Sequence, residues 1–457
     1  GGAMQLTLRD HLSELLRLAA PVVVARTGIL TMATADIVML GHYNAEDVAW
    51  YGIGITPFIV LLLIGIGLLT GTLVMTSHAR GAGRPADCGP VWRRSLPYAL
   101  LIGLIGTIIC RFTEPFFLMI GLAPAIAIGG GAVTAIAGLA LAPTLIHSNS
   151  TYFMEGLARP LPGMTVILFG NLLNLLLNWL LIFGHWGFPA MGAEGAIIAT
   201  SIVRCVMAAA LTGYIWWMRD HATFGIRRSL EGGWWRDSGE QWRLGYAAGV
   251  SQGVESAAFN SLTLMAGLLG PVALASYSIS LNVTALIFML ALGFGAATAV
   301  RVGAARGAGD HTRMVAAGWI GLGATTAIMI VLGVLLWVFR NEIAAFYTSA
   351  ADLRMILPAL FTIIALFLIA DGGQVVMTFA LRGAGDAWLP TAIHLMSFFV
   401  VMIPSAWVLA FPMGMGVRGL MIAIAMGAGA ALLALILRFR LATRGNARVS
   451  GKVLIHP

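Results

Sequence analysis

Long apolar stretches recur along the whole chain, separated by short segments that carry charges, glycine or proline. A helix needs roughly 20 apolar residues to cross a bilayer, and these stretches are long enough to do so. The first six helices are expected near residues 13–39, 50–76, 94–112, 124–148, 163–185 and 190–217. The second six are expected near residues 240–266, 272–298, 314–338, 354–380, 388–410 and 415–437. The pattern predicts an all-α integral membrane protein with twelve transmembrane helices.

Charged residues are too few for a soluble protein of this length. They make up 10% of the chain, whereas soluble domains contain about 25%. The formal net charge of +8 is better explained by basic loops on one side of a membrane than by a nucleic-acid partner. With the N-terminus inside, 21 of the 27 lysine and arginine residues fall in cytoplasmic segments and four fall on the opposite side. This bias follows the positive-inside rule and predicts that both termini are cytoplasmic.

Two short motifs occur once in each half of the chain. Residues 79–83 read Ala-Arg-Gly-Ala-Gly after the second expected helix, and residues 305–309 repeat this sequence after the eighth, 226 residues later. Residues 191–192, Met-Gly before the sixth helix, are matched by residues 415–416 before the twelfth, 224 residues later. Nearly equal offsets at equivalent points indicate a duplicated six-helix bundle.

Duplication of an even number of helices gives both bundles the same orientation, related by a pseudo-two-fold axis along the membrane normal. We expect an N-terminal lobe over residues 1–217, a cytoplasmic linker over residues 218–239, and a C-terminal lobe with a cytoplasmic tail over residues 240–457. A cavity between two such lobes, opened alternately to each side, is typical of a transporter. A channel would place repeated polar rings around one pore, and no such rings are found in the sequence.

Three acidic residues fall well inside expected helices, namely Asp36, Glu255 and Asp371. An ionised carboxylate at mid-bilayer costs at least about 2.5 kcal/mol, and such residues usually mark an ion or proton pathway. The alternative is a protonated or arginine-paired carboxylate that only fixes helix packing. Three acids in one chain favour the pathway.

Side chains that carry oxygen accompany the two acids of the second half. Gln252 lies one turn before Glu255, and Gln374 lies one turn after Asp371. Asn282 in the eighth helix could join them. Because both acids fall near half depth on helices that run in opposite directions, we expect them to face a common cavity.

Asp36 in the first half is expected to meet polar residues of the fifth helix. Three asparagines share one face of that helix, at positions three and four residues apart: Asn171, Asn174 and Asn178. Amide and carboxylate oxygens are hard ligands that suit a small cation, although single asparagines more often join membrane helices. Arg26 and Arg204 also fall within spans, where we expect each to pair with a carboxylate or to line an aqueous cavity.

The order and spacing of these residues resemble the multidrug and toxic compound extrusion (MATE) family, and within it the NorM-like branch. The resemblance covers essentially the whole chain. Its motifs are Ala20-Pro21 with Asp36, residues 155–160 (Glu-Gly-Leu-Ala-Arg-Pro), Asn174 with Asn178, Glu255, residues 280–282 (Ser-Leu-Asn), residues 300–303 (Val-Arg-Val-Gly), residues 371–374 (Asp-Gly-Gly-Gln) and residues 381–383 (Leu-Arg-Gly).

The resemblance implies an antiporter, coupled to Na⁺ or H⁺, that exports organic and often cationic drug-like compounds. It implies cation-binding residues Glu255 and Asp371 in the second half, and Asp36, Asn174 and Asn178 in the first. In a sodium-coupled member, Na⁺ would be held by the three acids. No cofactor is expected besides the coupling ion.

Three features of the sequence bear on which coupling ion and which class of membrane protein are expected. Phe367 stands where NorM-like members often have a tyrosine, which removes one oxygen ligand and slightly favours protons in the second half. Arg26 and Arg204 keep open a flippase for lipid-linked precursors, whose cavity would carry more cationic side chains. A membrane enzyme is disfavoured, because neither His-Glu-x-x-His nor a paired Asp-rich motif occurs in the sequence. We therefore predict a monomeric, non-enzymatic transporter of small organic molecules in the cytoplasmic (inner) membrane of a bacterium.

Overall fold

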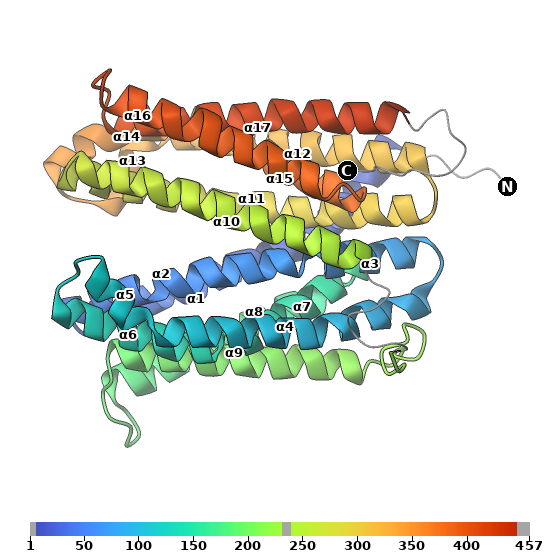
Figure 1. Cartoon of the computed structure of the whole chain (residues 1–457), viewed down its shortest axis with the longest axis horizontal. Helices are drawn as coiled ribbons and strands as arrows, with labels where there is room; N and C mark the ends of the chain where they lie inside the picture. Colours follow the sequence, from blue (N-terminus) through green and yellow to red (C-terminus); the bar gives the residue numbers. More distant parts are fainter. Residues whose placement is uncertain (1–5, 231–238, 446–457) are drawn as a thin grey trace. The chain divides into compact units, whose positions relative to one another are not determined.

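The computed structural model describes residues 6–230 and 239–445, which contain helices and connecting loops but no strand (Figure 1). The first ten elements are α1 (Leu8–Gly41), α2 (Ala45–Leu68), α3 (Thr70–Gly81), η1 (Pro85–Asp87), α4 (Cys88–Arg111), α5 (Thr113–Met119), α6 (Pro124–Leu139), α7 (Leu141–Gly156), α8 (Leu161–Phe183) and α9 (Ala193–Trp216). The others are α10 (Gly239–Leu268), α11 (Pro271–Gly307), α12 (His311–Val338), α13 (Arg340–Tyr347), α14 (Ala351–Gly383), α15 (Trp388–Leu395), η2 (Met396–Met402), α16 (Ile403–Ala410) and α17 (Val417–Gly445).

Twelve of the described stretches of helix correspond to the twelve expected spans. Ten are long and apolar enough to cross a membrane, and the α6–α7 pair, bent by 47°, brings the number to eleven. Helix α10 has 30 residues but is too polar to be counted by composition, since it carries Gln252, Glu255 and Asn260. Its length and its place at the start of the second half make it the twelfth. The structure therefore confirms the all-α membrane fold.

Two of the spans are interrupted where proline removes a backbone donor. Pro143 lies in the first turn of α7, and its ring is incompatible with the carbonyl four residues earlier, at the end of α6. The helix bends between α6 and α7 at this point. Pro404 follows the π-helical segment η2 in the same way, and a π-turn is a common response to a missing i→i−4 hydrogen bond.

The chain divides into two compact units. Residues Val24–Gly249 form one, called the N unit here, and residues Gly1–Val23 with Val250–Pro457 form the other, called the C unit. The limits fall inside α1 and α10, which are the first helices of the two predicted halves. In the N unit α8 packs on α9, α2 on α6 and α4 on α7, whereas in the C unit α14 packs on α11, α12 and α17. The lobe limits predicted from the sequence stay a prediction.

The repeated motifs have the same backbone conformation in both halves. Gly83 after α3 has φ +72° and Gly309 after α11 has φ +70°. In both copies, the residue after this glycine donates its backbone N–H to the carbonyl of the motif's first alanine, at 3.0 Å. This bond, six residues to one, ends a helix with a left-handed glycine. Gly192 and Gly416, which precede α9 and α17, agree as closely, with φ of +60° and +61°.

The first part of the predicted linker packs against the N unit. The carbonyl of Phe224 accepts a hydrogen bond from Gly89 N at 2.7 Å. Arg159 donates to Asp220 at 2.6 Å, and this hydrogen bond holds the pKa of the Asp220 carboxyl below its usual value. Residues 231–238 of the linker lie outside the described residues.

Candidate ion-coupling site

Asp36 lies at the centre of a buried hydrogen-bond cluster in the N unit. Its Oδ1 accepts from Asn174 Nδ2 at 3.0 Å and from Asn178 Nδ2 at 2.7 Å, both from α8. Its Oδ2 accepts from the Tyr51 hydroxyl of α2 at 2.6 Å and from the Thr200 hydroxyl of α9. The side chains of Asp36, Asn174 and Asn178 are fully buried. The structure thus brings together the three residues that the sequence predicted here, and adds two.

Four donors on one carboxylate satisfy most of its acceptor sites, because an ionised carboxylate offers about four. Amide nitrogens, rather than amide oxygens, point towards Asp36. The Asn174 oxygen lies 3.2 Å from the Thr200 hydroxyl, and the buried Asn178 oxygen has no hydrogen-bond partner. The cluster as it stands holds an anion with neutral donors.

Close approach of α1 and α8 makes this cluster possible. A Cβ on Gly28 would lie 2.1 Å from Ile167 Cγ2, so glycine is the residue that admits α8 here. Asn171 donates to the carbonyl of Gly28 at 3.0 Å. This asparagine therefore joins the two helices and does not reach Asp36, unlike Asn174 and Asn178 on the same face.

Arg26 of α1 is paired with an acid that the sequence interpretation did not select. Its guanidinium makes two parallel hydrogen bonds to the Glu155 carboxylate of α7, of 2.7 and 2.9 Å. The side chains are 15% and 4% exposed, respectively. Glu155 was placed outside the fourth span because that helix was expected to end near residue 148, whereas α7 continues to Gly156. A buried arginine on the neighbouring helix was the signal that could have found it.

Glu255 of α10 and Asp371 of α14 form the acid pair of the C unit. Both side chains are only partly exposed, and the two carboxylates interact electrostatically. Glu255 has no ion pair among the described residues, although Arg382 contributes some opposite charge. The side chain of Gln374 lies within hydrogen-bonding reach of Asp371. The two acids therefore lie near each other, and the common cavity predicted from the sequence stays a prediction.

A buried polar chain continues from the acid pair. Gln374 Oε1 lies 3.0 Å from His394 Nε2, and His394 Nδ1 lies 3.4 Å from Ser251 Oγ. Arg382 donates to Ser251 at 2.8 Å. The guanidinium of Arg382 therefore donates to a hydroxyl group, and its charge partly offsets that of Glu255 without forming an ion pair with it.

A single family profile matches both halves of the chain. The MatE family profile matches residues 21–180 and 247–408, two segments that begin 226 residues apart. That offset equals the offset of the Ala-Arg-Gly-Ala-Gly motif. The chain belongs to the MatE family.

The MatE relatives are similar along almost their entire length. A probable multidrug resistance protein NorM of Caulobacter vibrioides is 39% identical over 95% of this chain and 92% of its own. The multidrug resistance protein PmpM of Pseudomonas aeruginosa is 31% identical over 96% of this chain and 93% of its own. Among solved structures, the eukaryotic MATE transporter AtDTX14 superposes with a TM-score of 0.88 at 19% identity, covering 98% of this chain and 100% of its own. This last likeness concerns the fold.

Three residues singled out in the second half of this MatE protein make no hydrogen bond to Glu255 or Asp371 among the described residues. Asn282 of α11 is exposed and accepts a hydrogen bond from the Tyr347 hydroxyl at 2.7 Å. Gln252 is partly exposed. Phe367, which stands in place of a tyrosine, is 3% exposed and belongs to the apolar core of the C unit.

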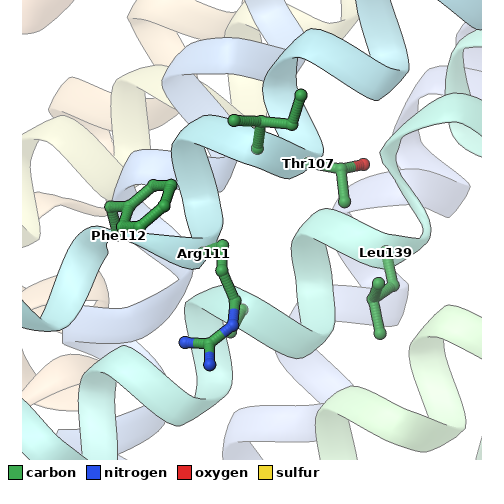
Figure 2. Close-up of a pocket in the computed structure, with 6 residues that line it drawn as sticks. Thr107, Arg111, Phe112 and Leu139 are labelled. Carbon is green, nitrogen blue, oxygen red and sulfur yellow. The ribbon is translucent and has the colours of Figure 1, made fainter.

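A pocket of ≈ 350 Å³ opens elsewhere in the N unit, between α4 and α6 (Figure 2). Its lining residues are Thr107, Ile108, Arg111, Phe112, Ala135 and Leu139. Ile108, Phe112 and Leu139 are each more than 60% exposed, as expected of side chains that face lipid. None of the predicted ion-site residues lines this pocket.

The oxygens of the acid pair fit a small cation. Carboxylate and amide oxygens are the ligands that Na⁺ and other hard cations prefer, and Glu255, Asp371 and Gln374 supply them in the C unit. The charge also fits, since two acids face one arginine that is bonded to other groups. A single monovalent cation, or one shared proton, would balance the remaining charge.

Proposed function

We propose that this MatE protein is a multidrug efflux transporter, an antiporter that couples entry of Na⁺ or H⁺ to export of organic, often cationic, drug-like compounds by alternating access. Its relatives carry names of multidrug resistance proteins, which supports the substrate class. We place it in the cytoplasmic membrane of a bacterium as a monomer with both termini inside. The proposed transport moves the substrate across the membrane and leaves it chemically unchanged.

The acid pair carries this proposal. Glu255 and Asp371 are ionisable groups inside membrane helices, with less opposite charge nearby than their own charge. Leaving that imbalance inside a membrane is costly, so the pair favours a state in which an ion or proton is bound. If the two conformations of the transporter bind that ion with different affinity, ion binding shifts the equilibrium between them. Coupling of ion entry to substrate export follows.

Transport by the purified protein in proteoliposomes tests the proposal. Sodium and proton gradients are imposed separately, and export of a fluorescent organic cation is followed. We expect one gradient to drive export, and expect Glu255→Gln and Asp371→Asn each to reduce gradient-driven export at least about tenfold, because one ligand charge is lost. Failure of both gradients to drive export would contradict the proposed function, and full activity of both variants would contradict the site.

The flippase alternative loses its main observation. It rested on two intramembrane arginines that could line a cationic cavity. Arg26 is bound to Glu155 at 2.7 Å, and the Arg204 guanidinium covers the ring of Phe58 at 4.6 Å. The two arginines therefore do not form the pair of free cationic groups on which this alternative rested, because Arg26 is engaged by a carboxylate.

A further inference from the structure

Arg204 of α9 has no hydrogen-bond acceptor among the described residues. Its guanidinium lies over the Phe58 ring, 4.6 Å from the ring centre. One guanidinium nitrogen, Nη1, is buried without a partner. An arginine cannot lose its charge in a protein, and a buried charge without compensation is costly. A nearby negative charge must therefore balance Arg204.

The helix geometry places Arg204 beside the Asp36 cluster. Thr200, which donates to Asp36, precedes Arg204 by four residues and so shares its face of α9. Tyr51, which also donates to Asp36, precedes Phe58 by seven residues, two turns along one face of α2. Thr200 and Tyr51 bind Asp36, and Arg204 and Phe58 lie one and two turns further along the same faces of α9 and α2. Arg204 therefore lies close to Asp36. Asp36 is also the acid that acts electrostatically on Arg204.

The other buried acids of the N unit have other partners among the described residues. Glu155 is engaged by Arg26 through two hydrogen bonds, and Asp47, in the first turn of α2, accepts a hydrogen bond from the backbone N–H of Ala193. Arg26 is thus paired with Glu155, which leaves Asp36 as the acid that acts on Arg204. In the C unit, by contrast, Glu255 and Asp371 lie near each other, and of these two acids Arg382 acts on Glu255 alone.

We propose that Arg204 is a built-in counter-ion of Asp36, so that the coupling ion binds at Glu255 and Asp371 alone. This inference rests on the proposed ion-coupled transport. Arg204 supplies the positive charge that an exchanging cation would otherwise supply at Asp36. The four hydrogen bonds to Asp36 already fill its acceptor sites, and the Asn178 oxygen is the one oxygen of the cluster without a partner. A cation entering there would meet an arginine of like charge and would have to displace those donors.

Joint removal of the two charges distinguishes a counter-ion from an ion ligand. Asp36→Asn alone leaves Arg204 without compensation, and Arg204→Met alone leaves Asp36 without it. We expect each to reduce gradient-driven export at least about tenfold, and expect the double variant Asp36→Asn/Arg204→Met to recover to within about threefold of the wild-type rate. The matched control is Asp36→Asn/Arg26→Met, which removes an arginine that belongs to Glu155 and should not recover.

If Asp36 were itself a ligand of the coupling ion, the double variant would remain as inactive as Asp36→Asn, and the proposal would be overturned. Arg204→Lys provides a second reading, because it keeps the charge: it should retain most of the export that Arg204→Gln loses. Full export by Arg204→Gln would also overturn the proposal.

Thermal melting of the same variants does not depend on transport. The single variants should melt at lower temperature than the wild type, and the double variant should melt near it, because the two losses are not additive for a coupled pair. Additive losses would contradict the pairing. If neither gradient drove export by the wild-type protein, the proposed function would fail, and this cycle would still decide whether Arg204 balances Asp36.

Discussion

The first half of the chain contains a buried ion pair between Arg26 and Glu155. The two parallel hydrogen bonds satisfy both partners in a fixed geometry. Such a pair adds little net stability compared with apolar residues of similar size, but loss of one partner strands the other charge. The pair is therefore expected to fix the contact between α1 and α7.

Glu155→Gln should destabilise the protein by about 3–5 kcal/mol, the cost of an uncompensated buried charge. The double variant Arg26→Met/Glu155→Met should return close to the wild-type stability, because no charge remains unpaired. Thermal melting in detergent measures both. Arg17→Met, at an exposed position of the same helix, serves as the control and should melt as the wild type does. Equal losses in the single and double variants would show that the ion pair is not the cause.

The sequence predicted the acids of the site more completely than their partners. Asp36, Glu255 and Asp371 could be found because a carboxylate inside an apolar run is rare and costly. Tyr51 and Thr200 could not, since a single hydroxyl at the membrane is common and carries no periodic signal. Their role depends on which helices meet at Asp36, and this is a property of packing between spans 15 or more residues apart in the chain.

Helix positions in the N unit are set by small residues at close contacts. Gly54 of α2 faces α6: a Cβ there would lie 2.5 Å from the backbone oxygen of Gly130 and 2.6 Å from Val133 Cβ. The Thr134 hydroxyl donates to the Gly54 carbonyl across this contact, at 2.5 Å. Membrane helices approach closely where such small residues allow it. Gly52, two residues earlier, has no atom within 4 Å of the Cβ position.

Gly54→Ala should therefore destabilise the protein by about 1–3 kcal/mol, as overpacking against backbone does. Gly52→Ala should be neutral or stabilise by up to about 1 kcal/mol, because alanine is the better helix former. Melting temperatures of the two variants in the same detergent make the comparison. Since both substitutions add one methyl group to the same helix, equal melting temperatures would mean that the α2–α6 contact does not limit packing.

Helix spans were predictable from the sequence, but their ends were less so. Apolar length and charge placed each span near its observed position, for example 388–410 against Trp388–Ala410. The short helices α5 and α13 were not predicted, because seven or eight residues after a span carry too little periodicity. The bend at α6–α7 was also missed. It depends on how one proline near the helix start is accommodated, which apolar length does not reveal.

At the scale of the whole molecule, the duplication is the feature that the sequence and the structure share most fully. The repeated motifs end and begin equivalent helices with matching glycine conformations, and one family profile matches both halves. The two halves nevertheless carry different charges in their spans: a buried Arg26–Glu155 ion pair in the first, and two neighbouring acids, Glu255 and Asp371, in the second.

The orientation of these bundles in the membrane rests on the distribution of arginine and can be tested directly. Cys88 and Cys110 are buried, whereas Cys205 is exposed, so Cys205→Ser gives a background that should not react with a maleimide. Phe188→Cys, in the exposed loop before α9, and Ser229→Cys, after α9, then introduce one reactive thiol each. Because α9 crosses the membrane once, the two thiols should lie on opposite sides. A membrane-impermeant maleimide should label Phe188→Cys in intact cells and label Ser229→Cys only after the membrane is opened. The reverse pattern would place both termini outside and contradict the positive-inside assignment.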